Sequence, residues 1–577
     1  MPEPEAKGGQ HEQIELADLH RGSCRDVSQH IIEVMNISRR AVLGSAAFAA
    51  AAAQTPANDR LTEIFKKHDA GVQRMLAIQN TDTSSRFRGG FPDEYGMYPT
   101  GSASGFLAIG IAAALSPQSR FHHDAELIQR MRLAADFVSR TLTPDGNVNL
   151  YITNFNSTPD TGFVVHGLAS ATVVAQRRKE QELLAISVPI LKRMGASLAH
   201  GGIHTPNHRW VVSAALAQLY EIFREPSYLK RIDQWLAEGI DIDEDGQFDE
   251  RSTTVYNTVC DHAFTTMAAK LNRPELLEPV RRNLNSMLYL VHPNGDVVTE
   301  ISRRQDLNTR GNMGRYWFPL QYLAIHDGNG QFGQMAENLF GSHASALPLL
   351  EYPELLQHPK TEPLPDNYLK ELKTSGCVRI RRGAWSATIL SGRDRFFTIR
   401  NGDAIVNAVR FASAFFGKGQ FAGGPMLRDG SSWRMTQNLE GPYYQPLDPP
   451  QKVAAGQWGA FRSQRKQTQI CKLEQSATIT ELPNGFRLRM QSDGTPDVPV
   501  SVEINVREDV QISGIDKDSI LASGQAELRA GSSTLRIGPG HREHSYTQIR
   551  GALPKLPGST VYLTGLTPFD QTIEFKG

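Results

Sequence analysis

Hydrophobic positions follow a helical spacing through the first half of the chain. Between about residue 59 and residue 342, apolar residues recur every three or four positions, for example from Ala125 to Leu142. Short polar or Gly- and Pro-containing connections separate these segments, as expected for about eleven or twelve helices that lie antiparallel to their neighbours. No strict repeat accompanies them, which argues against a regular solenoid. The pattern predicts an (α/α) toroid, a closed ring of helical hairpins, over residues 55–345.

The spacing changes to alternation in the second half of the chain. Residues 346–375 are rich in proline and are predicted to form a linker. After them, apolar and polar residues alternate in short runs such as 377–382 and 500–506, bounded by turn signals. This pattern predicts an antiparallel β-sandwich domain over residues 376–577. The expected fold class is therefore multidomain, an N-terminal (α/α) toroid of helical hairpins followed by an antiparallel β-sandwich.

The N-terminal segment carries an export signal. Arg39 and Arg40 precede an uncharged run from Leu43 to Ala53 that ends in small residues suited to cleavage. The Ser-Arg-Arg-x-x-Leu pattern resembles twin-arginine signals, which direct folded proteins for export. The run is too short for a membrane anchor, which needs roughly 20 apolar residues. We expect a signal peptide over 35–54, a periplasmic or secreted bacterial protein, and no membrane anchor after cleavage.

Residues 1–34 precede this signal. They are polar and show no apolar period. A signal peptide should not follow such a leader. We therefore interpret 1–34 as a misassigned leader and Met35 as the real start, with a functional leader as the alternative.

Composition narrows the possible functions. Lys plus Arg and Asp plus Glu are equal at 61 each, whereas nucleic-acid-binding proteins are strongly basic. Apart from Cys24 in the leader, the cysteines show no C-x-x-C spacing, so neither a disulfide framework nor a zinc site is predicted. We expect no nucleic acid partner and no required cofactor, and the number of subunits stays open.

Three polar clusters in the helical half are candidates for chemistry. The first is the predicted helix start at Asn207, His208 and Arg209, where the helix dipole suits an anionic substrate group. The alternative is that Asn207 caps the helix and His208 is structural. The second cluster surrounds Tyr256, which begins another predicted helix, and a core tyrosine is its alternative. The third is an Arg-rich loop from Arg303 onward that suits bidentate carboxylate binding, or is simply a solvated run of charge.

One reaction uses all three clusters together. Eliminating a uronic-acid glycoside removes the proton at C5, beside a carboxylate, and expels the oxygen at C4. That proton becomes acidic only when Asn, His or Arg donors neutralise the carboxylate. A Tyr or His must take the proton, and a Tyr or His must protonate the leaving oxygen. Asn207, His208, Tyr256 and the arginines of 303–310 supply this set, which predicts an anionic polysaccharide or oligosaccharide as substrate.

The same residues carry a resemblance to a known group of enzymes. A toroid followed by a β-sandwich, with Asn-His at a helix start and a later Tyr, is similar to the heparinase II/III-like and alginate-lyase group of polysaccharide lyases. The resemblance implies that Asn207 neutralises the uronate carboxylate. It also implies that His208 assists or acts as base and that Tyr256 is the base or the acid. Arg310 and Tyr316 complete the expected catalytic set.

The β-domain departs from that group. Its lyases bring β-domain residues to the cleft, and 396–421 with Arg410 occupies the corresponding place, but the His-rich motif is missing. Tyr316, Tyr443 or Tyr444 is the candidate replacement. Trp210 or Trp317 could stack on a sugar ring, although burial is the commoner state of a tryptophan. The expected substrate-binding residues are Arg209, Trp210, Asn257, His262, Arg303, Arg304, Trp317, Arg410, Tyr443 and Tyr444.

An acidic stretch has the spacing of a calcium loop. Asp241, Asp243, Asp245 and the following glycine match the D-x-D-x-D-G pattern of an EF-hand, with Asp249 nearby. The twelfth position is Ser252, so the bidentate glutamate is absent there. The sequence allows a structural calcium ion on these four aspartates, and an acidic turn is the slightly favoured alternative.

Two rival functions fit the same fold. A toroid glycoside hydrolase would use paired carboxylates flanking the bond. A non-catalytic protein could capture oligosaccharides in the toroid, because a fold does not determine a function. The carboxylates available to a hydrolase are Asp93, Glu94, Asp160, Asp249, Glu250 and Asp261.

Overall fold

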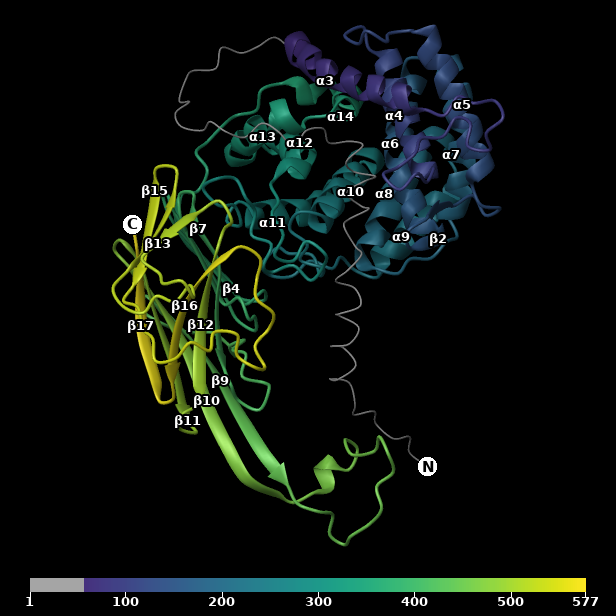
Figure 1. The fold of residues 1–577 in the computed structure, drawn as a ribbon. Helices are drawn as coiled ribbons and strands as arrows, with labels where there is room; N and C mark the ends of the chain where they lie inside the picture. Colours follow the sequence, from purple (N-terminus) through teal and green to yellow (C-terminus); the bar gives the residue numbers. More distant parts are fainter. Residues whose placement is uncertain (1–56) are drawn as a thin grey trace. The chain divides into compact units, whose positions relative to one another are not determined.

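The structure, a computed structural model, describes residues 57–577 (Figure 1). The expected signal peptide and the leader before it lie outside the described residues. The chain forms two compact units. The first runs to Leu288 and resumes over Ser302–Leu364, and the second consists of Tyr289–Ile301 and Pro365–Gly577.

Twelve α-helices build the described part of the first unit. Five of them, α4, α6, α8, α10 and α12, pack against one another in succession and form an inner layer. The helices α5, α7, α9, α11 and α13 each follow an inner helix and pack outside it. The bounds are α3 Ala57–Ile78, α4 Thr100–Leu115, α5 Ala125–Thr141, α6 Thr158–Arg177, α7 Gln181–Leu198, α8 Pro206–Phe223, α9 Pro226–Ala237, α10 Tyr256–Leu271, α11 Leu277–Met287, α12 Trp317–Asp327, α13 Gly330–His343 and α14 Ala346–Glu351.

The two layers differ in how much of each helix is buried. In α8 every residue from Asn207 to Leu219 is buried, so the helix has core on all sides. In the outer helix α9 only Tyr228 and Ile232 are buried, and the rest of the surface is polar or partly exposed. Helices that alternate between these environments give the two-layered arrangement of an (α/α) toroid, as the sequence predicts.

The beginning and the end of the unit close the helical array. α14 packs on α3, α4 and α6, and the 3-10 helix Pro353–Leu356 contacts both α3 and α12. Arg60 of α3 donates to Glu337 of α13 over 2.9 Å. The hairpin of β1 (Val148–Leu150) and β2 (Asn154–Ser157) leads into α6.

The second unit is an antiparallel β-sandwich. Its sheets have the strand orders β13-β14-β15-β17-β11-β10-β9-β8 and β16-β12-β7-β6-β5-β4-β3. Alternate residues such as Val502 and Ile504 of β12 and Leu488 of β11 enter one shared hydrophobic core. The bounds are β3 Asn367–Leu372, β4 Cys377–Arg382, β5 Trp385–Leu390, β6 Phe397–Asn401, β7 Ala404–Ser413, β8 Leu427–Asp429, β9 Ser432–Tyr444, β10 Gln467–Leu482, β11 Gly485–Gly494, β12 Pro499–Val506, β13 Gln511–Ser513, β14 Ala526–Ala530, β15 Ser533–Gly538, β16 Ser559–Leu566 and β17 Phe569–Lys576.

The segment expected to be a linker contains regular structure. Residues 346–375 include α14, the 3-10 helix Pro353–Leu356 and strand β3. Proline is compatible with the first turn of a helix, so the proline content did not exclude these elements. The excursion Tyr289–Ile301 also joins the β-unit, where the Arg400 guanidinium donates to Asp296 over 2.9 Å.

None of the described helices is long and apolar enough to cross a membrane. Cys260, Cys377 and Cys471 are free thiols.

A buried group of charges joins four helices of the first unit. Lys270 of α10 forms ion pairs with Glu351 of α14 and, at 2.5 Å, with Glu221 of α8. Ser170 of α6 donates to the Glu351 carboxylate over 2.5 Å. The side chains of Lys270 and Glu351 are almost completely buried, so each charge depends on the other for compensation.

We therefore expect Glu351→Ala to lower the free energy of unfolding by about 3 kcal/mol, the low end for a broken buried pair, because Glu221 still faces the ammonium. Chemical denaturation measures this effect. Glu362→Ala is the matched control, since its pair with Lys360 is exposed and should contribute under about 1 kcal/mol. Equal losses in both variants would contradict the role of the buried pair.

Candidate active site

Asn207 lies in the first turn of α8. Pro206 precedes it, and the fixed φ angle of proline suits a helix start. The buried amide of Asn207 donates to Glu250 Oε2 over 2.6 Å and to Thr205 Oγ1 over 3.2 Å. Its side chain therefore does not cap the helix, and it links α8 to the segment before α10.

Glu250 connects Asn207 with the Arg-rich loop. Its Oε1 accepts a hydrogen bond from Arg304 Nη1, and its Oε2 accepts the bond from Asn207. Burial raises the pKa of the Glu250 carboxyl, and the Arg304 charge opposes that shift. The carboxylate is thus held between a charged donor and a neutral donor inside the protein.

Tyr256, the first residue of α10, lies next to the same arginine. Gln305 Nε2 donates to the Tyr256 hydroxyl over 2.8 Å, and Arg304 Nη2 lies 3.5 Å from that oxygen. The Arg304 guanidinium also lies over the Tyr256 ring, 4.6 Å from its centroid. Two donors therefore converge on the phenolic oxygen.

The buried Asp306 carboxylate fixes the loop that carries Arg304 and Gln305. It accepts hydrogen bonds from Ser252 Oγ over 2.9 Å and from the Thr254 amide over 3.1 Å. Ser252 Oγ in turn accepts a hydrogen bond from the backbone amide of Tyr256 over 3.0 Å. One network thus positions both the loop and the start of α10, which is the support a preorganised site needs.

His208 completes the cluster on the α8 side. Its ring contacts His204 edge to face, with centroids 4.7 Å apart, and Phe163 at 6.2 Å. Burial lowers the pKa of His208 to about 3, and the neighbouring His204 and Arg304 act in the same direction. The imidazole is therefore neutral at neutral pH. We call Asn207, His208, Glu250, Tyr256 and Arg304 the Asn-Tyr cluster.

Solved structures share the architecture around this cluster. No protein-family model matches the sequence, and no curated protein matches it significantly. The chondroitin AC lyase of Streptomyces coelicolor A3, solved with chondroitin sulphate, is 14% identical with a TM-score of 0.55 over 95% of this chain and 82% of that one. Heparinase III is 12% identical with a TM-score of 0.51 over 98% and 89%. A Paenibacillus xanthan lyase is 8% identical with a TM-score of 0.58 over 90% of this chain, which spans only 57% of that enzyme. The chain has a polysaccharide lyase fold.

Within this lyase fold, several residues expected at the site belong to the core. Trp210 is fully buried and its Nε1 donates to Asp241 over 2.7 Å, and Trp317 is also buried, so neither ring can stack on a sugar. Tyr316 is buried and donates to the Thr253 carbonyl over 2.5 Å, which supports the α10 start and removes it from the expected catalytic set.

Other expected residues lie outside the Asn-Tyr cluster. The Arg209 guanidinium donates to Asp241 over 2.8 Å, and the Asn257 amide donates to Gln247 over 2.8 Å. Arg303 is exposed and pairs with Asp249 at 2.9 Å. Arg310 is exposed on the same loop, and His262 contacts Phe318 of α12 with ring centroids 4.7 Å apart.

Three further expected residues belong to the second unit. Arg410 is buried in the sandwich, where its guanidinium donates to Glu503 through two nitrogens, so its role there is structural. Tyr443 is exposed near the end of β9. Tyr444 is partly exposed, and Arg462 lies 5.7 Å from its ring centroid.

The contacts of the four aspartates do not support the calcium site that the sequence allows. The Asp241 carboxylate is engaged by Arg209 and Trp210, and Asp243 accepts from Arg251 over 3.2 Å. Among the described residues, no three His, Cys, Asp or Glu side chains are grouped so that they could hold a metal ion. The D-x-D-x-D-G spacing reflects an acidic turn held by arginines.

Sequence reasoning missed two parts of the site. Glu250 was placed in the cluster around Tyr256 and among the hydrolase carboxylates but was given no role in elimination, and Gln305 and Asp306 were not singled out. No local pattern connects Glu250 with Arg304, because the two are far apart in the chain and meet only through the fold. The Arg-rich loop itself was the single available signal for its neighbour Gln305.

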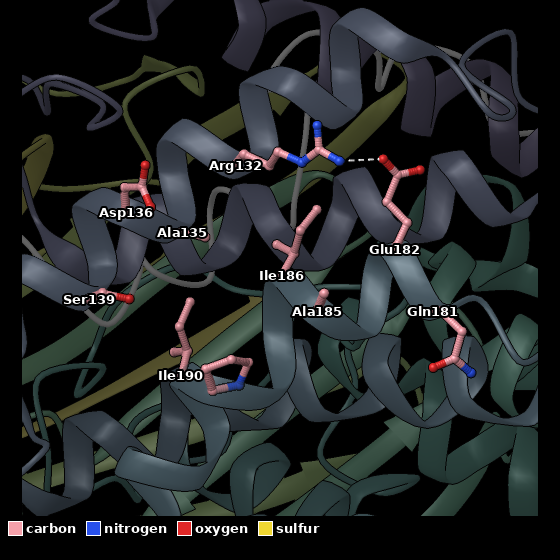
Figure 2. A pocket seen from close by; sticks show the side chains of 10 residues that line it. Arg132, Ala135, Asp136, Ser139, Gln181, Glu182, Ala185, Ile186 and Ile190 are labelled. Atoms are coloured by element: carbon pink, nitrogen blue, oxygen red, sulfur yellow. Dashed lines mark hydrogen bonds and ion pairs between the residues drawn. The ribbon is translucent and has the colours of Figure 1, made fainter.

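A surface pocket of about 690 Å³ lies elsewhere, between the outer helices α5 and α7 (Figure 2). Arg132 of α5 and Glu182 of α7 pair across it at 2.5 Å, and Ile186 and Ile190 form part of its wall. These helices contribute no residue to the Asn-Tyr cluster. The pocket is therefore separate from the candidate active site.

Two more histidines of the inner layer share the neutral state of His208. The rings of His166 on α6 and His262 on α10 meet edge to face with centroids 5.8 Å apart. Burial lowers the pKa of His166 to about 3 and that of His262 to about 4. Each therefore has a lower pKa in the folded than in the unfolded state, where the ordinary value is about 6.5.

Acid should therefore destabilise the first unit. Below about pH 6.5 these histidines become protonated in the unfolded chain but stay neutral in the folded protein. The free energy of unfolding therefore decreases as the pH is lowered from about 6.5 to about 3–4. Each histidine contributes up to about 1.4 kcal/mol per pH unit. His262→Gln should reduce the slope of Tm against pH between pH 6.5 and 4.5. His200→Gln, which changes an exposed histidine, should leave the slope unaltered. A wild-type slope in His262→Gln would contradict this origin.

Proposed function

We propose that the protein is a lyase that cleaves a uronic-acid-containing polysaccharide or oligosaccharide by β-elimination. The observation that carries the proposal is the Asn-Tyr cluster, in which Glu250 joins Asn207 to Arg304 and Arg304 contacts Tyr256. The shared fold with lyases acting on chondroitin and xanthan supports the same class of reaction.

The electrostatics of the cluster suit a bound carboxylate. An unpaired Glu250 would repel a uronate, but Arg304 and Asn207 both engage its carboxylate. The neutral imidazole of His208 adds no negative charge and can donate one N–H. The starts of α8 and α10 add the positive ends of two helix dipoles. We assign His208 to donating to the uronate carboxylate, and Asn207 to the same task once it exchanges its 3.2 Å bond to Thr205 for the substrate. Neutralising that carboxylate is what makes the C5 proton removable.

Tyr256 is the group we assign to proton transfer. Its oxygen, as phenolate, takes the proton from C5, and the C4–O4 bond breaks as the C4–C5 double bond forms. The same hydroxyl then returns the proton to O4 of the departing sugar, so the tyrosine ends as it began. Gln305 and Arg304 stabilise the charge that this oxygen carries. His208, with a pKa of about 3, is a weak base for this step.

The hydrolase alternative finds less support in the contacts of its carboxylates. Hydrolysis needs two carboxyl groups facing one bond. Glu250 is engaged by Arg304 and Asn207, and Asp160 accepts from Ser157 over 2.5 Å at the start of α6. Asp261 is fully buried in α10. We therefore favour elimination.

The direct test is an assay on a panel of chondroitin sulfate, heparan sulfate, xanthan and alginate. Elimination conjugates the new C4–C5 double bond with the carboxylate, so at least one polymer should give rising ultraviolet absorbance together with new reducing ends. New reducing ends without absorbance would indicate hydrolysis. Binding without new ends would indicate a carbohydrate-binding protein.

Tyr256→Phe should lower kcat by about a thousandfold, since it removes only the hydroxyl that transfers the proton. The ring and its contact with Arg304 remain, so Tm should stay near the wild-type value. Tyr220→Phe near the other end of α8 is the matched control and should retain full activity. Activity near wild type in Tyr256→Phe would show that another residue transfers the proton.

A further inference from the structure

Strands β9 and β10 extend beyond the rest of their sheet. The pairing of β10 with β11 ends at Leu473 and Gly494, whereas β9 and β10 continue to pair with each other as far as Tyr444 and Gln467. We call residues 440–472 the arm. Figure 1 shows it as a two-stranded ribbon that ends in a long loop away from the sandwich core. A two-stranded ribbon has no core of its own.

Aromatic side chains are exposed along the arm and at its base. Tyr443 is 55% exposed and Trp458 is 49% exposed. Phe416, 44% exposed, packs edge to face on Tyr443 with centroids 5.6 Å apart. Gly441 makes this possible, because a Cβ atom there would lie 2.2 Å from the Phe416 ring. A group of exposed aromatic rings on an element without a core marks an interaction surface.

The loop of the arm is basic, and its cations lack acidic partners. Residues 445–466 hold one acidic residue, Asp448, and four basic ones, Lys452, Arg462, Arg465 and Lys466. Within the described residues none of these four pairs with a carboxylate. Arg465 instead lies 3.8 Å from the Trp458 ring centroid, and Arg462 lies 5.7 Å from that of Tyr444.

Arginines elsewhere on the same sheet behave differently. On β11 Arg487 pairs with Glu574 at 2.7 Å, and Arg489 pairs with Asp570 at 2.5 Å. Exposed arginines of this sheet can thus find carboxylates on neighbouring strands. The four cations of the loop 445–466 are left to bind an external anion.

We propose that the arm is a second binding surface, for anionic polysaccharide, carried by the β-unit. The class of ligand rests on the proposed function. Guanidinium groups bind carboxylate or sulfate through two parallel hydrogen bonds. The flat apolar faces of sugar rings pack on exposed aromatic rings such as Trp458. Arg465 and Trp458 present both chemistries at one place.

Charge complementarity favours a polyanion over a second copy of the chain. In a symmetric dimer with the arm at the two-fold axis, its basic loop would face an equally basic loop. Like charges across an interface are unfavourable, whereas a polyanion neutralises them. Holding a long polymer on the arm raises its effective concentration at the enzyme without changing the chemical step.

Charge reversal tests the proposal directly. The variant Arg462→Glu/Arg465→Glu of the full chain is compared with Lys517→Glu/Lys555→Glu, which makes the same charge change at exposed sites of the β-unit outside the arm. Fluorescently labelled chondroitin sulfate, heparan sulfate and alginate are the probes, with neutral dextran as the negative control. The arm variant should bind at least one polyanion about tenfold more weakly than the control variant.

Trp458→Ala should also weaken binding of the polyanion. Because the Trp458 ring is half exposed, the Tm of this variant should stay at the wild-type value. Equal affinities of the arm and control variants for every polyanion would overturn the proposal. A wild-type dimer that the arm variant converts to monomer in light scattering would overturn it in favour of self-association.

Kinetics separate this proposal from the proposed function. On a polymer that is cleaved, the arm variant should raise KM about tenfold and leave kcat unchanged, while KM for a tetrasaccharide stays at the wild-type value. Loss of binding in the arm variant without any lyase activity in the wild type would support the arm and contradict the lyase. Lyase activity with unchanged polymer binding and KM in the arm variant would contradict the arm alone.

Discussion

The buried carboxylate of Glu250 is the contact on which the candidate site depends. It joins the start of α8, through Asn207, to the loop that carries Arg304, and the same arginine reaches Tyr256 at the start of α10. A buried carboxylate is costly unless charged and neutral donors satisfy it. The requirement that Glu250 be compensated therefore fixes where Asn207 and Arg304 lie. The contacts that compensate the buried charge of Glu250 are therefore the same contacts that set the geometry of the site.

The helical array explains why residues so distant in sequence meet. An outer helix returns the chain between successive inner helices, so α8 and α10 start at the same rim of their layer. Asn207 and Tyr256 are each in the first turn of such a helix. The loop before α12 then needs only Asp306, bonded to Ser252 and Thr254, to complete the arrangement. The fold brings the helix starts to one rim, and a few buried polar groups hold the side chains and the loop there in position.

The sequence predicted this arrangement in outline. Helical and alternating spacings separated the two units. Asn207, His208 and Tyr256 were proposed for the site because each stands at a predicted helix start, and the structure has helices beginning at Pro206 and Tyr256. Burial was harder to predict, because inner helices are enclosed on all sides and their spacing does not tell which face meets solvent. Trp210 and Tyr316 were for this reason expected at a site and lie in the core.

The pairing of carboxylates with arginines distant in the chain could not be predicted from the sequence. The four aspartates from 241 to 249 match a calcium loop in spacing, but Asp241 and Asp243 are engaged by Arg209 and Arg251. Glu250 acquires its role in the same way, from an arginine that the fold brings to it. A carboxylate's function in this protein thus depends on which guanidinium reaches it. Where an arginine saturates the carboxylate at a surface turn, the result is structure. Arg304 contacts both Glu250 and the phenol of Tyr256, so one of its N–H groups stays directed at the oxygen to which we assign proton transfer.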